Sequence, residues 1–382
     1  MKIKLTLLAV LAVGVTTLAQ RPVVTAADVL AKATLPPGFH LSVFAEGVAS
    51  ARGMAVGAKG TVFVGSMDAR TVYALVDTTG RHTNATVKVI ATGLLKPTGV
   101  AFHDGALYVA AQTKIVRFDN IEANLDNPPA PMTVIDKLPA MHHDWKFLAF
   151  GPDGWLYVSD GSPCNVCENA DPRFSSILRL KPDGTNLEVF ANGVRNSVGF
   201  DWDPVTHNLW FTDNGRDDLG NDIPNDELNV ATKAGEHFGF PYCHQGNISD
   251  PTFGAKRPCS EFVPPAQFMG PHVAAIGMRF YTGSMFPASY KNAIFIAQHG
   301  SWNKVDAPSG YRVMVARVSG AKVTSFEPFI EGFLQGVRGV GRGNSLNGNA
   351  LARPADVQPL RDGSLLVSDD QGGRVFRVTY SK

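Results

Sequence analysis

The chain has 382 residues, of which 44% are hydrophobic, and its formal net charge is +1. This length and composition can bury a large core, whereas the near-neutral charge argues against nucleic acid or a membrane surface as a partner. The 38 glycines and 25 prolines, with few long stretches of helical period, indicate many short strands joined by turns and therefore an all-β protein.

Residues 1–19 have the layout of a secretory signal peptide, with two early lysines, an apolar run from Leu5 to Val15 and a small-x-Ala sequence ending at Ala19. We expect the mature chain to start near Gln20 and the protein to be secreted or periplasmic. The alternative is an uncleaved anchor, but the apolar run is shorter than the roughly 20 residues that span a bilayer. No later segment is apolar enough to span, so we expect no stable membrane insertion.

A strand-turn-strand pattern is repeated along the chain. Its six copies begin at Gly53, Gly99, Phe147, Val198, Gly277 and Ala355. A third strand follows in most copies, and three similar segments ending in glycine supply a fourth: residues 41–47, 87–93 and 187–193. Four-stranded antiparallel units repeated six times predict a six-bladed β-propeller over residues 35–382.

The two ends of the repeat predict how the ring closes. A strand from Leu41 to Ala45 stands before the first complete copy, and the last copy ends at Val378 after three strands. We therefore expect the N-terminal strand to complete the C-terminal blade, which removes exposed sheet edges. Wider spacing between later copies predicts loop insertions on one face, at 213–275 and 319–350. A β-sandwich or a propeller with fewer blades is the alternative fold.

The four cysteines are Cys164, Cys167, Cys243 and Cys259. In an exported protein an even number of cysteines usually forms disulfides. We expect Cys243 to pair with Cys259, which leaves Cys164 and Cys167 to close a short loop. Zinc is disfavoured because no second ligand pair has matching spacing, and haem attachment because Glu168, not histidine, follows Cys167.

Residues just ahead of each copy should enter the central channel, because the innermost strand of each blade lines it. They are Arg52, Lys96 to Thr98, His142 to Lys146, Arg195, Asn196, His272 and Arg353. His143 is a candidate general base, since a neutral imidazole is the usual proton acceptor. A hydrogen-bonded loop histidine is the alternative. His142 should point to the opposite face of an extended chain, so only one of the pair should face the channel.

Other polar groups suggest an anionic ligand and a metal. Arg195 and Asn196 place a bidentate donor fork beside an amide, which suits a carbonyl or a carboxylate, although a salt bridge between blades would use the same arginine. Arg353 and Lys304 add two cations. The oxygen-rich segment 213–229 has the composition of a calcium loop but lacks EF-hand spacing, and an acidic solvated loop has the same composition.

Several segments resemble the secreted quinoprotein sugar dehydrogenases, in the sorbosone and pyranose dehydrogenase branch, and the resemblance runs from about Leu35 to Val378. The most specific segments are 143–154, 162–167, 193–196, 214–217 with 226–229, 238–243 and 299–304. Members of that family are six-bladed propellers that bind pyrroloquinoline quinone (PQQ) with calcium. The resemblance therefore implies both cofactors and the oxidation of a sugar or a sugar-derived aldehyde.

The resemblance also implies individual roles. His143 matches the catalytic base, which takes a proton from the sugar hydroxyl as hydride passes to the quinone. Arg195 and Asn196 match the pair that contacts the quinone and the reacting oxygen, and Gly215 and Arg216 match a loop whose backbone carbonyls bind calcium. Three further residues are expected to bind the cofactor: His272, Lys304 and Arg353.

Three positions depart from the family pattern. Ser197 stands where a proline is common, Thr98 where a histidine is common, and Ala355 where some relatives have a basic residue that helps to hold the cofactor's carboxylates. The reduced cofactor would need an external electron acceptor, a cytochrome or a quinone. Competing functions are a calcium-dependent lactonase on a similar propeller, which would need carboxylate and asparagine ligands converging on the axis, and a non-catalytic binding propeller.

Overall fold

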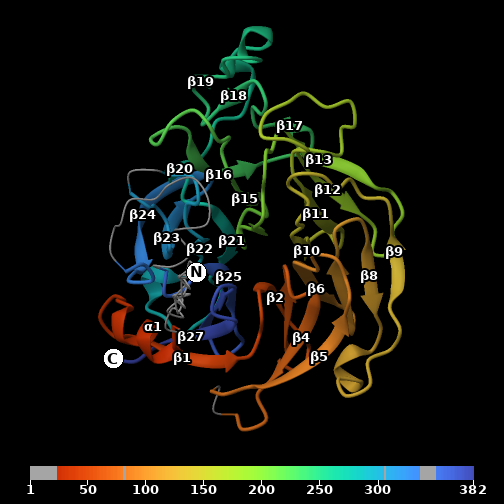
Figure 1. The fold of residues 1–382 in the computed structure, drawn as a ribbon, viewed down its shortest axis with the longest axis vertical. Helices are drawn as coiled ribbons and strands as arrows, with labels where there is room; N and C mark the ends of the chain where they lie inside the picture. The colour runs from red at the N-terminus through yellow and green to blue at the C-terminus, as the bar shows by residue number, and fades with distance from the viewer. Residues whose placement is uncertain (1–23, 81–82, 305–306, 336–349) are drawn as a thin grey trace, which may run out of the picture.

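The computed structural model describes residues 24–80, 83–304, 307–335 and 350–382. Six sheets surround a central axis as blades (Figure 1), which confirms the predicted six-bladed β-propeller. The expected signal peptide lies outside the described residues. Within the described part of the chain, no helix is both long and apolar enough to cross a bilayer.

The first three blades follow the chain in order. Blade 1 contains β2 (Ala51–Val56), β3 (Val62–Ser66), β4 (Thr71–Val76) and β5 (Thr86–Thr92). Blade 2 contains β6 (Gly99–His103), β7 (Ala106–Ala110), β8 (Ile115–Phe118) and β9 (Met132–Ile135). Blade 3 contains β10 (Leu148–Phe150), β11 (Leu156–Asp160), β12 (Ser176–Leu180) and β13 (Glu188–Asn192), with β17 (Glu236–His237) added in parallel beside β13.

The last three blades complete the ring. Blade 4 contains β14 (Phe200–Trp202), β15 (Leu209–Asp213), β16 (Asn225–Ala231) and β20 (Gln267–Pro271). Blade 5 contains β21 (Ala275–Phe280), β22 (Ile294–Gln298), β23 (Arg312–Ser319) and β24 (Lys322–Ile330). Blade 6 contains β25 (Pro354–Pro359), β26 (Leu365–Asp369), β27 (Arg374–Tyr380) and β1 (Phe39–Glu46).

A few short elements lie outside the blades. They are the helix α1 (Ala26–Lys32), the hairpin of β18 (Cys243–His244) and β19 (Ile248–Ser249), and the 3₁₀ turns η1 (Ile121–Ala123), η2 (Gly254–Lys256), η3 (Cys259–Glu261) and η4 (Ala288–Tyr290). Thr25 caps α1, and its hydroxyl accepts the backbone N–H of Asp28. The sequence pattern did not indicate this helix.

Ring closure occurs as predicted, because β1 pairs antiparallel with β27 and places Val43 opposite Phe376. At the start of β1, the ring of Phe39 packs edge-on against Phe286 and Phe329, with centroids 4.8 and 4.9 Å apart. These aromatic contacts belong to a large apolar cluster shared by blades 5 and 6. The closing strand is therefore held by burial as well as by backbone hydrogen bonds.

Glycine begins or follows the start of several copies because the innermost strands approach one another closely at the axis. A Cβ atom on Gly99 would lie 2.7 Å from the carbonyl oxygen of Lys146. One on Gly199 would lie 2.1 Å from the carbonyl oxygen of Ile276. Any side chain there would push neighbouring blades apart, so these glycines set the narrow centre of the propeller.

The predicted loop insertions are wrong in part. Residues 213–275 include β16 and β20, which are the third and outer strands of blade 4, and β18–β19 projects beyond the outer rim in Figure 1. Likewise β24 occupies the start of 319–350, whose residues 336–349 lie outside the described part. Strand β16 escapes pattern-based prediction because it buries Asp226 and Glu227, residue types that are seldom fully buried.

The structure contains both expected disulfides, one joining Cys243 to Cys259 and the other joining Cys164 to Cys167. The first links the β18–β19 hairpin to η3. The second closes a small ring in the connection from β11 to β12. This connection lies beside the central cavity, as described below.

Candidate active site

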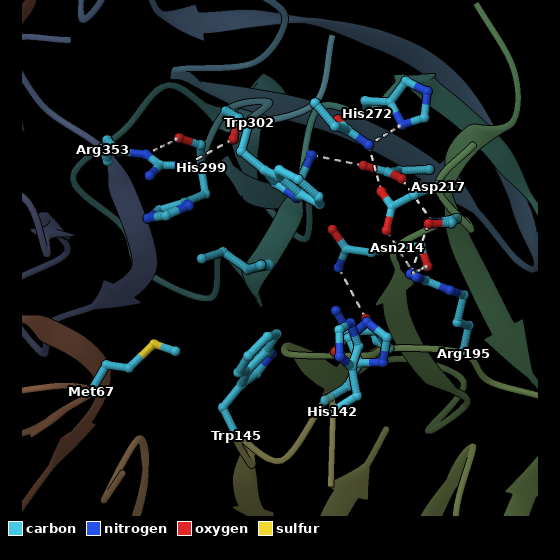
Figure 2. A pocket seen from close by; sticks show the side chains of 18 of the residues that line it. Met67, His142, Trp145, Arg195, Asn214, Asp217, His272, His299, Trp302 and Arg353 are labelled. Atoms are coloured by element: carbon cyan, nitrogen blue, oxygen red, sulfur yellow. Dashed lines mark hydrogen bonds and ion pairs between the residues drawn. The ribbon is translucent and has the colours of Figure 1, made fainter. Parts of the chain in front are cut away.

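A cavity of about 450 Å³ lies where the loops ahead of the innermost strands converge. Its volume is in the range of sites that hold small ligands and cofactors. The cavity brings together these sequence-predicted residues: His143, Arg195, Asn196, Gly215, His272 and Arg353. Two others, Lys304 and Arg216, do not line it. In Figure 2, Arg353 and Arg195 lie on opposite sides of the cavity.

His143 is held in one tautomer. Its Nδ1 lies 2.8 Å from the carbonyl oxygen of Ser162. A carbonyl oxygen only accepts hydrogen bonds, so Nδ1 carries the proton and Nε2 keeps a free lone pair. Burial and the nearby charge of Arg195 lower the pKa of His143 to about 3. The imidazole is therefore neutral near pH 7, with the Nε2 lone pair free.

The prediction that His142 faces away from the channel is wrong, since both histidines line the cavity. Their rings meet edge to face with centroids 4.5 Å apart. His142 and His143 lie in a turn rather than an extended strand, so side chains do not alternate between two faces here. His142 is exposed at the cavity mouth, whereas His143 is buried.

Arg195 is buried, and hydrogen bonds occupy its whole guanidinium group. Its Nε and Nη2 donate to the backbone oxygen and the side-chain Oδ1 of Asn165, both at 2.9 Å. Its Nη1 donates to the carbonyl oxygens of Asn214 and Gly215 at 3.0 and 2.7 Å. Asp217 Oδ2 lies 3.4 Å from Nη2. The expected donor fork therefore joins loops of neighbouring blades, and Arg195 offers the cavity its charge rather than free donors.

Asn196 presents an unsatisfied acceptor. Its backbone N–H donates to Asp213 Oδ1 at 2.6 Å, which fixes the start of the segment. Its side-chain Oδ1 is buried without a hydrogen-bond partner among the described residues. Buried polar atoms are rarely left unpaired. This oxygen in the cavity wall is therefore placed to accept a hydrogen bond from a ligand.

Two buried carboxylates support the backbone beneath these groups. Asp213 accepts from the N–H groups of Arg195 and Asn196 at 2.8 and 2.6 Å. Asp226 accepts from the N–H of Gly215 at 2.9 Å and, with its other oxygen, from a second backbone N–H. Burial raises the pKa of Asp213 to about 7 and that of Asp226 to about 6. Both groups hold backbone in place, and Asp226 also lines the cavity.

The predicted calcium loop at 213–229 is only partly a loop, since its end forms β16. Among the described residues, no three His, Cys, Asp or Glu side chains converge as a metal site. Gly215 lines the cavity and directs its carbonyl oxygen toward Arg195, whereas the Arg216 side chain pairs with Asp250 at 2.5 Å. A calcium ion here would rely mainly on backbone carbonyl oxygens.

The opposite side of the cavity is cationic. Arg52 Nη2 and His299 Nε2 lie 2.8 and 2.9 Å from Asp370. Arg353 donates to the carbonyl oxygens of His299 and Gly300 at 3.2 and 2.9 Å. Burial, followed by the charge of Arg353, lowers the pKa of His299 to about 4. Two arginines therefore face one carboxylate at neutral pH, which leaves a net positive charge.

Arg52 was predicted to enter the channel, but the sequence did not indicate that it would lie on the same side of the cavity as Arg353. The signal was its position just ahead of the first copy. Asp370 gave no such signal, because it follows β26 and does not stand ahead of an innermost strand. Ala355, the departure from a basic residue, is buried near the axis, so Arg52 provides the second cation on this side.

His272 and Lys304 have different surroundings. His272 Nε2 donates to the carbonyl oxygen of Gly220 at 2.8 Å, and Asn303 Nδ2 lies 3.3 Å from Nδ1. Both ring nitrogens thus have protein partners, although the ring forms part of the cavity wall. Lys304 is half-buried outside the lining. Their roles in cofactor binding stay predictions.

Apolar side chains complete the cavity wall. Trp145 and Met67 lie on one side of the cavity in Figure 2, and Trp302 is 56% exposed at the mouth. Trp145 lies in the segment 142–146, which was expected to enter the channel, whereas Met67 and Trp302 were not predicted there. Aromatic faces of this kind pack well against flat rings and against the C–H faces of sugars.

The fold is a six-bladed propeller with a cavity on its axis. The family model for glucose / sorbosone dehydrogenase matches residues 109–345. A Borreliella burgdorferi protein described as uncharacterized is 32% identical over 374 residues, which cover 94% of each chain. The chain belongs to the glucose / sorbosone dehydrogenase family.

More distant relatives carry functional names. The aldose sugar dehydrogenase YliI of Escherichia coli is 25% identical over 263 residues, covering 64% of this chain and 62% of that protein. The holo PQQ domain of pyranose dehydrogenase from Coprinopsis cinerea superimposes with a TM-score of 0.75 at 18% identity, covering 91% of this chain and 97% of that domain. The PQQ-bound aldose sugar dehydrogenase of Streptomyces coelicolor superimposes with a TM-score of 0.64 at 22% identity, covering 91% of this chain and 100% of that chain. These two structural similarities concern the fold.

Proposed function

We propose that this protein is a PQQ- and calcium-dependent dehydrogenase that oxidises a sugar or a sugar-derived aldehyde and passes the electrons to an external acceptor. The observation that carries the proposal is the state of His143. The Ser162 carbonyl fixes its proton on Nδ1, which leaves Nε2 as a neutral base in a cavity with a cationic wall. The family membership and the PQQ-binding relatives support the same chemistry.

The residues in the cavity fit PQQ, which is a flat quinone bearing carboxylates. Arg52 and Arg353 give one side a positive charge, which suits those carboxylates. The unpartnered Oδ1 of Asn196 suits a donor on the ring system. Trp145 supplies an apolar face, and the Gly215 carbonyl oxygen, which accepts from Arg195, has a second lone pair for a cation. When bound, PQQ supplies a quinone that accepts hydride from the substrate carbon.

The protein's own part in the reaction is proton transfer and charge stabilisation. Nε2 of His143 takes the proton from the substrate hydroxyl, or from the hydroxyl of a hydrated aldehyde, as the C–H bond of the same carbon breaks. The Ser162 carbonyl keeps Nδ1 protonated and the ring oriented. The buried charge of Arg195 stabilises negative charge that develops nearby, because its hydrogen bonds hold it in place before the reaction begins.

The competing lactonase function has less support. Two carboxylates line the cavity, Asp217 and Asp226. Both oxygens of Asp226 accept backbone N–H groups, and the oxygens of Asp217 accept from Asn303 and Arg195. Protein donors therefore already occupy both oxygens of each carboxylate.

We also propose that the protein acts outside the cytoplasm. The proposal rests on the signal-peptide pattern of residues 1–19, and two disulfides in the folded chain agree with an oxidising compartment. A fusion of the first 19 residues to a reporter enzyme tests it. Export of the reporter supports the proposal, and retention in the cytoplasm contradicts it.

The function is tested by adding PQQ and calcium chloride to the purified protein and following dye reduction with a panel of aldoses and sugar-derived aldehydes. Binding of PQQ is followed in parallel through quenching of tryptophan fluorescence. PQQ-dependent dye reduction with at least one sugar supports the proposal. Saturated PQQ binding without dye reduction by any substrate rejects the dehydrogenase, and hydrolysis of sugar lactones by the same sample would favour the lactonase.

A further inference from the structure

The segment Ser162–Cys167, in the connection from β11 to β12, contacts both His143 and Arg195. The Ser162 carbonyl oxygen accepts from the backbone N–H of His143 at 3.2 Å and from its Nδ1 at 2.8 Å. The Ser162 N–H donates to the carbonyl oxygen of Arg195 at 2.7 Å. Three residues later, Asn165 accepts two hydrogen bonds from the Arg195 guanidinium at 2.9 Å. One short segment thus touches the proposed base and the proposed charge stabiliser.

The Asn165 side chain also holds the loop that follows β15. Its Oδ1 accepts the backbone N–H of Asp217 at 2.9 Å, and its Nδ2 lies 3.3 Å from the Asp217 carbonyl oxygen. The same loop carries Gly215, whose carbonyl oxygen accepts from Arg195. Asn165 therefore fills the space between Arg195 and this loop and satisfies polar groups on both.

The Cys164–Cys167 disulfide encloses Asn165 in a small ring, with Cα atoms 6.2 Å apart. Ser162 is tied to this ring, since its Oγ lies 3.4 Å from both the backbone N and the Sγ of Cys164. A covalent ring reduces the conformations open to the backbone inside it, so less entropy is lost when Asn165 binds Arg195. The disulfide prepares the segment for its contacts rather than contributing to a core.

We infer that the disulfide-closed segment Ser162–Cys167 positions His143 and Arg195 relative to each other, and that Asn165 is the positioning residue that holds Arg195. Asn165 acts through Arg195 and does not touch the substrate. The inference rests on the proposed function where it concerns turnover. Its structural part, the hold of Asn165 on Arg195 and Asp217, can be tested without cofactor.

The cofactor-free test uses hydrogen exchange at the Asp217 amide, which donates directly to Asn165. The variants are Asn165→Ala and the double variant Cys164→Ser/Cys167→Ser, with Asn169→Ala as the matched control. Asn169 is exposed, and its side chain accepts from the backbone of Asp171. Exchange about tenfold faster in both test variants, with no change in the control, supports the inference. Unchanged exchange in Asn165→Ala overturns it, whether or not the cysteine variant folds.

The functional test measures kcat per molecule of bound PQQ, so that loss of folded protein does not count as loss of catalysis. Asn165→Ala should lower kcat about tenfold with a smaller change in KM, because displacing a reacting group by about 1 Å can cost as much as a hundredfold in rate. Asn165→Asp keeps the oxygen that accepts from Arg195 and should recover most of the loss. A lower melting temperature with unchanged kcat would show a role in stability alone and would overturn the inference.

The two proposals can fail separately. If the wild-type protein binds PQQ but turns over no sugar, the proposed function fails. The exchange experiment still decides whether Asn165 holds the loop and Arg195. If the wild type is active and Asn165→Ala has normal kcat, the positioning role fails and the dehydrogenase stands.

Discussion

Nδ1 of His143 lies 2.8 Å from the carbonyl oxygen of Ser162, and this contact determines which ring nitrogen is the base. Because the carbonyl can only accept, the free lone pair belongs to Nε2. The neighbouring ring of His142 is exposed, and it makes no such hydrogen bond to any residue that the structure describes. The two adjacent histidines are therefore not equivalent.

Replacing His143 with alanine should lower kcat by about 10² to 10⁴, the usual contribution of a general base. PQQ affinity should change little, because the substitution removes the proton acceptor and leaves the arginines in place. In the matched variant His142→Ala, kcat should fall by less than about tenfold. Steady-state dye reduction together with a PQQ titration checks both, and equal losses in the two variants would reject His143 as the specific base.

The pH profile of kcat/KM should fall on its acid side only at unusually low pH. Burial and the charge of Arg195 lower the pKa of His143 to about 3, so the base is neutral at pH 5 and above. We expect kcat/KM to lose little on this account from about pH 7 to pH 5. Arg195→Gln removes a positive charge, which should raise the pKa of His143 and move the acid limb to higher pH. Profiles with the same acid limb in both proteins would contradict this coupling.

Replacing Arg52 with alanine should weaken PQQ binding about tenfold, which corresponds to about 1.4 kcal/mol. Arg52 and Arg353 are the two arginines on the cationic side of the cavity, and Ala355 adds no charge there. The control is Arg70→Ala, which removes an exposed arginine from the same blade. Fluorescence titration at fixed calcium measures the affinity. Equal PQQ affinity in Arg52→Ala and Arg70→Ala would show that the carboxylates of PQQ do not bind near Arg52.

The ion pair between Lys146 and Asp160 should matter for stability. Both side chains are fully buried, with Nζ 3.1 Å from Oδ2, and burial raises the pKa of Asp160 to about 7 even beside the lysine. Lys146→Met leaves this carboxyl group unpaired, so its pKa should rise further. We expect a loss of about 3–5 kcal/mol at pH 8, as for other broken buried pairs.

The loss should be smaller near pH 5.5. In Lys146→Met, the folded-state pKa of Asp160 exceeds the unfolded value, so protonation favours the folded variant at low pH, and stability falls as the pH rises through the folded pKa. Urea unfolding at the two pH values measures the difference. Adding Asp160→Asn should restore part of the stability at pH 8. A pH-independent loss would contradict the interpretation.

The repeat made the fold predictable because every copy combines strand alternation with a turn, and several copies have a glycine at or near their start. Gly99 and Gly199 carry this signal for a physical reason, since a side chain there would collide with the next blade. Outer strands carry less signal. Strand β9 is half-exposed or exposed along its length, so its residues need not alternate between polar and apolar.

Individual site residues could be predicted from their place in each loop, but the contacts between loops could not. His143, Arg195 and Arg353 stand just ahead of inner strands, and the cavity does bring them together. The contacts between loops were not predictable, because they depend on how blades are placed around the axis. Asn165 holds an arginine that lies 30 residues away, and Asp370 meets His299, which lies 71 residues away. No local pattern encodes such partners.

The pairing of β1 with β27 also has a consequence for how the chain acquires its structure. Ser42 in β1 donates to the carbonyl oxygen of Arg377, 335 residues further along the chain. Strand β1, the first strand among the described residues, therefore pairs with β27 only after nearly all of the intervening chain has been synthesised. Such distant pairing slows folding, because a very long loop must close first. For the export proposed above, ring closure would follow passage of the whole chain across the membrane.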